Sequence, residues 1–126
     1  QEASKWRGPT ADGKFADTEL LSEWPLEGPE MLWSYNELGK GYSSPVVYNG
    51  KIYVAGATEP DGFIYVRDMD GKLLNKYTYG KEYFESYPGT RSSPTLAGDL
   101  LYFETGYGVV TCLKADSGEK VWSSGE

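Results

Sequence analysis

One segment of eleven residues occurs twice in this 126-residue chain, and the two copies align without a gap. The first copy occupies residues 43–53 and the second occupies residues 92–102. Each begins with Ser-Ser-Pro, continues through a two-residue turn and ends in tyrosine. Self-similarity at a period of roughly 20–50 residues is typical of repeat architectures, in which a unit buries its apolar face only against its neighbours. The repeat therefore predicts a chain built from copies of one small unit.

Each unit is expected to contain four short β-strands. Asn49-Gly50 predicts a tight hairpin, because a type I′ turn needs positive φ at both central residues, and Asp70-Gly71 predicts a later turn in the same way. We expect strands near residues 44–48, 51–55, 63–68 and 72–79, and again near 93–97, 100–105, 109–114 and 119–123. No helix is expected within residues 44–79 or 93–123.

Four antiparallel strands that recur at roughly 40–50 residues are typical of the blades of a β-propeller. The sequence thus predicts an all-β chain, made of propeller blades that are four-stranded antiparallel sheets. A propeller needs about four to eight blades, so we expect an incomplete propeller. We divide it into an extended N-terminal segment (1–30), an orphan outer strand with its connection (31–42), a first blade with a long loop (43–91) and a second blade (92–126).

Composition excludes several classes of function. Lys and Arg total 12 against 19 for Asp and Glu, and a nucleic-acid-binding surface needs a basic patch. The chain has no histidine, so it holds no histidine general base. The single cysteine, Cys112, lies in an apolar stretch and is expected to be buried and inert. No apolar run approaches the roughly 18–20 residues of a membrane-spanning segment.

The end of the second unit resembles a known family. Residues 115–122, Ala-Asp-Ser-Gly-Glu-Lys-Val-Trp, resemble the outer-strand motif of pyrroloquinoline-quinone-like (PQQ-like) β-propeller repeats. Residues 6–13 and 85–94 are also similar to bacterial secreted members of that family. The resemblance implies a periplasmic or extracellular protein whose signal peptide has been removed. It also implies that Trp33 and Trp122 are docking residues, buried between neighbouring blades.

The same resemblance implies two kinds of function. Some members are quinone-dependent alcohol dehydrogenases that hold PQQ and calcium, and others bind no quinone. The dehydrogenases carry a disulfide between adjacent cysteines, which this chain lacks, and Asn75 stands in place of a docking tryptophan. We therefore expect a non-catalytic interaction or scaffold module, with no catalytic or metal-binding residue. The alternatives are the N-terminal part of a quinone-dependent dehydrogenase, whose PQQ and calcium further blades would hold, and a propeller that binds glycans or small ligands.

The loop at residues 81–91 is the candidate binding segment. It is longer than the equivalent connection at residues 36–42, and binding residues are often found on loops of this kind. In propellers such connections lie on the face where the central funnel opens, and Tyr42 and Arg91 occupy equivalent positions in the two units. The candidate ligand-binding residues are Tyr42, Glu85, Tyr87 and Arg91. The alternative is structural, with Arg91 paired to Glu85. The expected partners are the remaining blades or copies of the chain, and a protein or glycan, but no nucleic acid.

Overall fold

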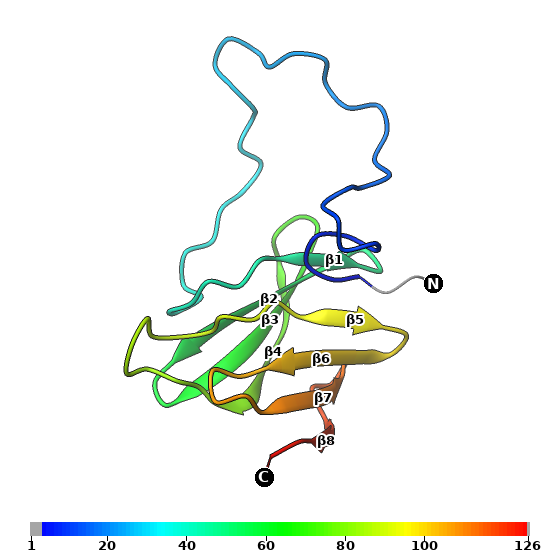
Figure 1. Cartoon of the computed structure of the whole chain (residues 1–126). Helices are drawn as coiled ribbons and strands as arrows, with labels where there is room; N and C mark the ends of the chain where they lie inside the picture. The colour runs from blue at the N-terminus through cyan, green and yellow to red at the C-terminus, as the bar shows by residue number, and fades with distance from the viewer. Residues whose placement is uncertain (1–3, 126) are drawn as a thin grey trace.

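The computed structural model describes residues 4–125, which form eight β-strands and no helix. The first sheet contains β1 (Val46–Tyr48), β2 (Lys51–Thr58), β3 (Asp61–Asp68) and β4 (Leu73–Lys81), and the second contains β5 (Thr95–Ala97), β6 (Leu100–Glu104), β7 (Val110–Lys114) and β8 (Lys120–Ser123). Within each sheet, every strand pairs antiparallel with the next one along the chain (Figure 1). The all-β prediction and the two four-stranded units are therefore confirmed.

The predicted turn between β1 and β2 is also confirmed. Asn49 has φ 51° and Gly50 has φ 68°, so both central residues are left-handed. This geometry matches the right-handed twist of the flanking strands and pairs Tyr48 directly with Lys51.

The first strand of each sheet, β1 or β5, is shorter than expected because a proline precedes it. Pro45 and Pro94 have no backbone N–H to donate to a ladder, and β1 and β5 begin only after them, at Val46 and Thr95. The Ser44 amide donates instead to Ser93 Oγ at 2.9 Å, which joins equivalent residues of the two units.

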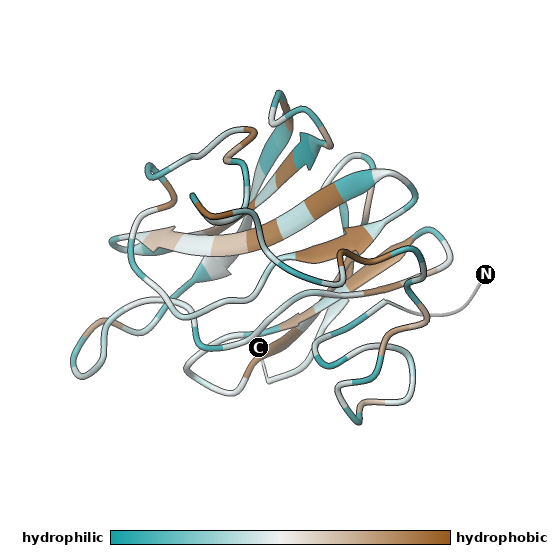
Figure 2. Ribbon diagram, turned by 90° about the horizontal axis from the view of Figure 1, so that it is seen from above, coloured by the Kyte–Doolittle hydropathy of each residue, from teal (hydrophilic) through white to brown (hydrophobic). Residues whose placement is uncertain are grey.

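The two sheets face each other across one apolar core (Figure 2). Because side chains alternate along a strand, β1, β2, β3, β4 and β6 each send two residues spaced two apart into this layer, whereas β5 and β7 send one each and β8 sends none. The core residues shared between the sheets are Val46, Tyr48, Tyr53, Ala55, Ile64, Val66, Tyr77, Tyr79, Leu96, Leu101, Phe103, Leu113 and Ala115.

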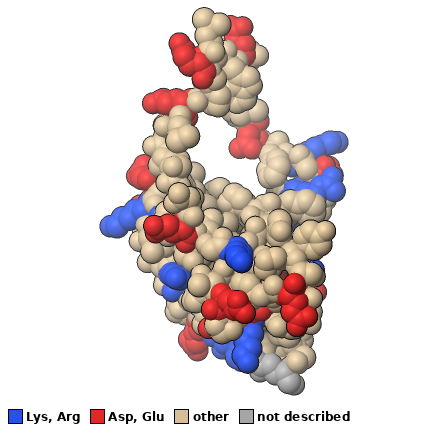
Figure 3. Space-filling model, turned by 90° about the vertical axis from the view of Figure 1, so that its left-hand side faces the viewer, with Lys and Arg blue, Asp and Glu red and all other residues tan. Residues whose placement is uncertain are grey.

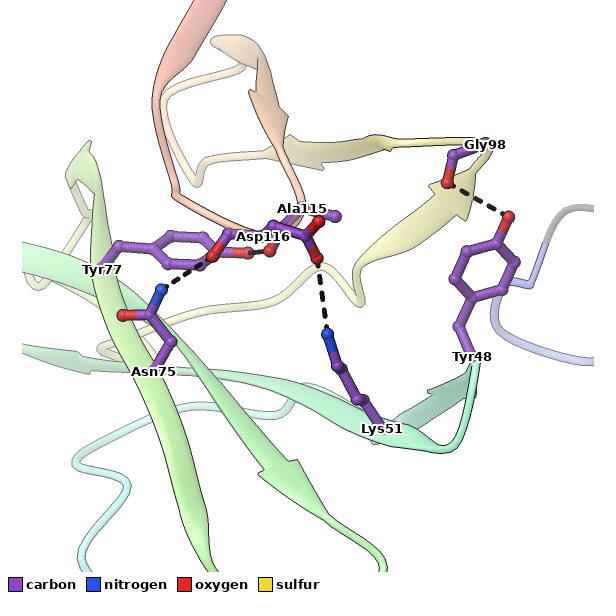
Figure 4. A network of polar contacts seen from close by, with 7 residues as sticks. All are labelled: Tyr48, Lys51, Asn75, Tyr77, Gly98, Ala115 and Asp116. Carbon is purple, nitrogen blue, oxygen red and sulfur yellow. Dashed lines mark hydrogen bonds and ion pairs between the residues drawn. The ribbon is translucent and has the colours of Figure 1, made fainter.

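Polar contacts fix the turn between β7 and β8 to the first sheet (Figure 4). The Tyr77 hydroxyl donates to the Ala115 carbonyl and Asn75 Nδ2 donates to the Asp116 carbonyl, both at 3.0 Å. Lys51 Nζ lies 3.4 Å from Asp116 Oδ1. Gly118 lies so close to Tyr77 that an added Cβ would be 2.3 Å from its Cγ. The second sheet is thus docked through a turn that only glycine permits.

Trp33 makes the equivalent contact with the first sheet. Trp33 aligns with Asn75, and its Nε1 donates to the Met69 carbonyl at 3.0 Å, in the turn between β3 and β4. A Cβ on Gly71 would lie 2.6 Å from the Trp33 ring. Trp33 therefore meets the β3–β4 turn as Asn75 meets the β7–β8 turn, and we call this hydrogen bond the side-chain-to-turn contact.

The expected outer strand at residues 31–35 does not form, although the segment lies where the repeat places it. Residues 31–37 have no strand hydrogen bonds. A strand needs a neighbouring backbone as its partner, and within residues 4–125 these residues meet turns and side chains instead.

The expected burial of Trp122 between sheets is wrong for this chain. Its side chain is 46% exposed on the outward face of the second sheet, with its ring centroid 6.2 Å from that of Tyr102. Nothing in the described residues covers it as the β7–β8 turn covers Asn75. Trp33 is 37% exposed despite its hydrogen bond.

The N-terminal residues 4–32 form no sheet of their own. Ser4 exchanges two 2.8 Å backbone hydrogen bonds with Leu96 at the free edge of β5, and its hydroxyl donates to the Val47 carbonyl. Residues 15–32 then leave the sheets in a wide arc with acidic side chains along it (Figures 1 and 3). No helix in the described part of the chain is long and apolar enough to span a membrane.

Candidate functional site

The connection at residues 36–42, which leads to β1, lies beside the connection at residues 81–91, which leads to β5. Gly41 forms a parallel bridge with Thr90, and the Tyr42 amide donates to the Thr90 carbonyl at 2.7 Å. Thr90 is fully buried, and a Cβ on Gly41 would lie only 2.2 Å from its hydroxyl oxygen. This close approach fixes the equivalent residues Tyr42 and Arg91, which follow immediately, next to each other.

Tyr42, Tyr87 and Arg91 together line a shallow hollow of about 290 Å³. The two tyrosines are 62% and 75% exposed. Three of the four residues proposed from the sequence therefore meet at one place, although they come from two segments 45 residues apart or more along the chain.

The Arg91 guanidinium is held by the loop itself. The chain turns at Tyr87, which has φ 44°, and at Gly89, which has φ 102°. Arg91 Nη2 donates to the Ser86 carbonyl at 2.5 Å and approaches the Tyr87 carbonyl at 3.5 Å. Its Cζ also lies 5.1 Å from the centre of the Tyr83 ring. A left-handed, non-glycine residue such as Tyr87 is strained, and strain of this kind clusters at functional sites.

Glu85 does not join this hollow, and the expected Arg91–Glu85 ion pair does not form. The ion pairs among the described residues are Lys51–Asp116 and Lys114–Glu119. Glu85 lines a neighbouring hollow with Phe84 instead. The backbone carbonyls take the place of the carboxylate, because the turn at Tyr87 brings them to the guanidinium.

Glu82 is the residue that the sequence did not reveal. Its side chain is 2% exposed, and its carboxylate accepts hydrogen bonds from the Tyr79 hydroxyl at 2.5 Å, the Tyr83 amide at 2.8 Å and the Gly106 amide at 2.6 Å. Burial, followed by the hydrogen bond to Glu82, raises the pKa of Tyr79 well above its usual range. The three donors come from β4, the loop of residues 81–91 and the β6–β7 turn, so Glu82 fixes this loop to the second sheet.

A glutamate in a polar loop ordinarily indicates a solvated side chain, so no sequence signal marked Glu82. The nearest hint is Gly106, where a Cβ would lie 2.8 Å from Glu82 Oε1.

A second hollow lies on the other side of Arg91. It has a volume of about 320 Å³ and is lined by Arg91, Ser92, Glu104, Thr105, Gly106 and Gly108. Arg91 thus separates an aromatic hollow from a polar one. The combined surface offers two flat rings, a cation and a carboxylate, which suits non-covalent recognition.

The remaining chemistry expected from the sequence is limited. Cys112 is fully buried, as predicted. Within residues 4–125, no group of three or more His, Cys, Asp or Glu side chains is placed to hold a metal ion. The quinone and calcium of the alternative function stay a prediction.

No family model matches the chain, and no curated protein matches it. The resemblance to PQQ-like repeats therefore remains a prediction carried by the motif residues alone.

Proposed function

We propose that the two sheets are neighbouring blades of a PQQ-like β-propeller, and that the propeller is a non-catalytic interaction module of the periplasm or cell surface. The propeller is supported by the side-chain-to-turn contact, which occurs twice at equivalent positions. A further blade that offered its own turn to Trp122 would make the third such contact and would cover that ring. The remaining blades are thus the first partners of this chain.

The binding role rests on one observation, the meeting of Tyr42 and Arg91 with Tyr87 in a single exposed hollow. Equivalent residues of successive blades then lie around one face of the ring, so each blade adds a side chain to a common surface. Tyrosine and arginine are enriched at the energetic centres of protein interfaces. Small-molecule sites are usually deeper clefts that bury most of the ligand. The shallow hollow therefore favours a macromolecular partner.

The partner that suits this surface best is a polypeptide that presents an acidic side chain beside an aromatic one. The acidic group would meet Arg91, whose planar guanidinium matches a carboxylate. The aromatic group would pack against Tyr42 and Tyr87, where ring pairs contribute about 0.5–1.5 kcal/mol beyond buried area.

A peptide array of acidic-aromatic sequences, read with the purified chain, tests this role. We expect Arg91→Ala and Tyr87→Ala to weaken binding about tenfold or more, as for central interface residues. Lys72→Ala removes an exposed cation from the β3–β4 turn and is the matched control, with unchanged binding expected. Array binding that is equal for all three variants would contradict the proposal.

Glycan binding is the second candidate, favoured by the two exposed tyrosine rings and by Glu104 in the adjoining hollow. A sugar ring stacks on an aromatic face and depends less on the charge of Arg91. A glycan array would therefore show retention that Tyr87→Ala abolishes and Tyr87→Phe preserves. Peptide binding without glycan retention would exclude this candidate.

A further inference from the structure

A larger cavity, unrelated to the hollows around Arg91, lies between the N-terminal segment and β1. Its volume is about 890 Å³, within the roughly 300–1,000 Å³ of small-molecule sites. One wall is β1, which contributes Val47, and the other is the loop of residues 4–17. The double hydrogen bond between Ser4 and Leu96 fixes the start of that loop to the second sheet.

The apolar part of the wall comes from side chains that normally avoid water. Trp6, Phe15, Val47 and Met69 all line the cavity, and each is more than half exposed. These residues belong to separate segments of the chain and face one common space. A ligand with a flat apolar body would remove all four from water at once.

The cationic part of the wall comes from Lys5 and Arg7, both of which line the cavity. The Arg7 guanidinium carbon lies 5.7 Å from the centre of the Trp6 ring, so a cation adjoins the largest aromatic surface. Residues 4–14 carry three basic side chains and one acidic one, Asp12. Blue side chains gather at one foot of the acidic arc in Figure 3.

The loop that presents Arg7 is fixed and strained. Arg7 has φ 67°, and the Gly13 amide donates to its carbonyl at 2.9 Å. Asp12 Oδ1 accepts from the Thr10 hydroxyl at 2.6 Å and from the Lys14 amide at 3.1 Å, and these bonds lower the pKa of Asp12. A positive φ at a non-glycine residue is costly unless the surroundings enforce it. The turn therefore holds Arg7 at the cavity.

We propose that this cavity binds a small amphiphilic anion, an aromatic carboxylate or sulfonate. The aromatic body packs between Trp6, Phe15 and Met69, and the anionic group meets Arg7 and Lys5. Asp17 also lines the cavity, and it disfavours ligands whose negative charge lies on that side.

The test uses naphthalene-2-sulfonate as the anionic probe and 2-naphthalenemethanol as its neutral analogue. The indole N–H signals of the four tryptophans, assigned by single substitutions, report where each probe binds in an NMR titration. We expect the sulfonate to shift the Trp6 signal. We expect Arg7→Gln to lower the affinity for the sulfonate about tenfold, the effect of losing one charge-assisted contact. Arg7→Lys should restore binding to within about threefold, because it keeps the charge. Met69→Ala, which lies outside the strained turn, should lower the affinity for both probes.

The proposal fails if the two probes bind with equal affinity or if Arg7→Gln leaves sulfonate binding unchanged. It also fails if the Trp24 and Trp122 signals move as much as the Trp6 signal, because the probe is then coating exposed apolar surface. A preserved Ser4–Leu96 pairing, seen as unchanged Leu96 amide shifts in Arg7→Gln, ensures that a loss of binding reports the charge.

Discussion

Glu82 shows how one residue can position the candidate binding loop, residues 81–91. Its buried carboxylate accepts three hydrogen bonds from three segments, and removing it leaves the buried Tyr79 hydroxyl and two part-buried amides without this acceptor. We expect Glu82→Ala to lower the free energy of unfolding by about 2–4 kcal/mol. Glu82→Gln should cost about 1–2 kcal/mol, since its amide oxygen still accepts. Urea unfolding measures both, with the exposed Glu85→Gln as the control, expected within about 0.5 kcal/mol of wild type. Equal stability of Glu82→Ala and Glu85→Gln would refute this role.

Three buried tyrosines give the chain a particular response to alkaline pH. Burial raises the pKa values of Tyr53, Tyr77 and Tyr79 above their ordinary value of 10.0. The folded state therefore holds these protons at pH values where the unfolded state releases them. Their contribution to stability is complete below about pH 10 and is lost as the pH rises above that value.

We expect the melting temperature to be constant up to about pH 9 and to fall steeply above about pH 10. The double variant Tyr77→Phe/Tyr79→Phe should show a shallower fall, whereas the exposed Tyr107→Phe should keep the wild-type slope. Calorimetry across the alkaline range makes the comparison. Identical slopes in all three proteins would show that the buried phenols do not govern the transition.

At the scale of elements, the sequence was informative where local chemistry decides the outcome. The turns at Asn49-Gly50 and Asp70-Gly71 located the strands, because turn signals act over a few residues. Their ends were less accurate. Pairing between β2 and β3 continues to Thr58 and Asp61, and Ser44 bonds to Ser93 rather than joining β1. Both depend on partners distant in the chain, which a repeat pattern does not specify.

The docking of one sheet on another can be measured with two glycines. Gly118 has φ 75° and lies against Tyr77, whereas Gly98 has φ 59° and no atom within 4 Å of an added Cβ. Alanine at either position meets the cost of a left-handed residue, about 1–2 kcal/mol. Only Gly118→Ala must also displace Tyr77, which adds about 1–3 kcal/mol. We expect chemical denaturation to show this difference. A Gly98→Ala variant as unstable as Gly118→Ala would mean that the docking contact contributes nothing.

At the scale of the whole molecule, the sequence located three residues of the candidate binding surface but not Glu82, which holds the loop in place. Tyr42 and Arg91 could be paired because the repeat register gives them equivalent positions. Glu85 could not be excluded, because its place depends on the left-handed turn at Tyr87. The exposure of Trp122 depends on which unit lies next to it. That neighbour is a property of the assembly, so the motif alone does not reveal it.

The outward face of the second sheet should drive association of the isolated chain. Val121 and Trp122 are both nearly half exposed on the edge strand β8, and residues 31–35 lack a strand partner. Free edges and apolar faces promote pairing with another chain. We expect light scattering to show a mass that rises with protein concentration, and Trp122→Arg should reduce the rise. A strictly monomeric mass at every concentration, with a cooperative melt, would show that two sheets suffice alone.

The proposed propeller and the proposed binding face both require that successive units dock in the same way. Nuclear Overhauser effects between protons of the docked pairs test this most directly. We predict cross-peaks from the Trp33 indole N–H to the protons of Met69 and from the Asn75 side-chain amide to the protons of Asp116, at similar intensity. If either pair lacks a cross-peak while the cross-strand peaks within each sheet are present, the two units do not dock alike and the account is contradicted.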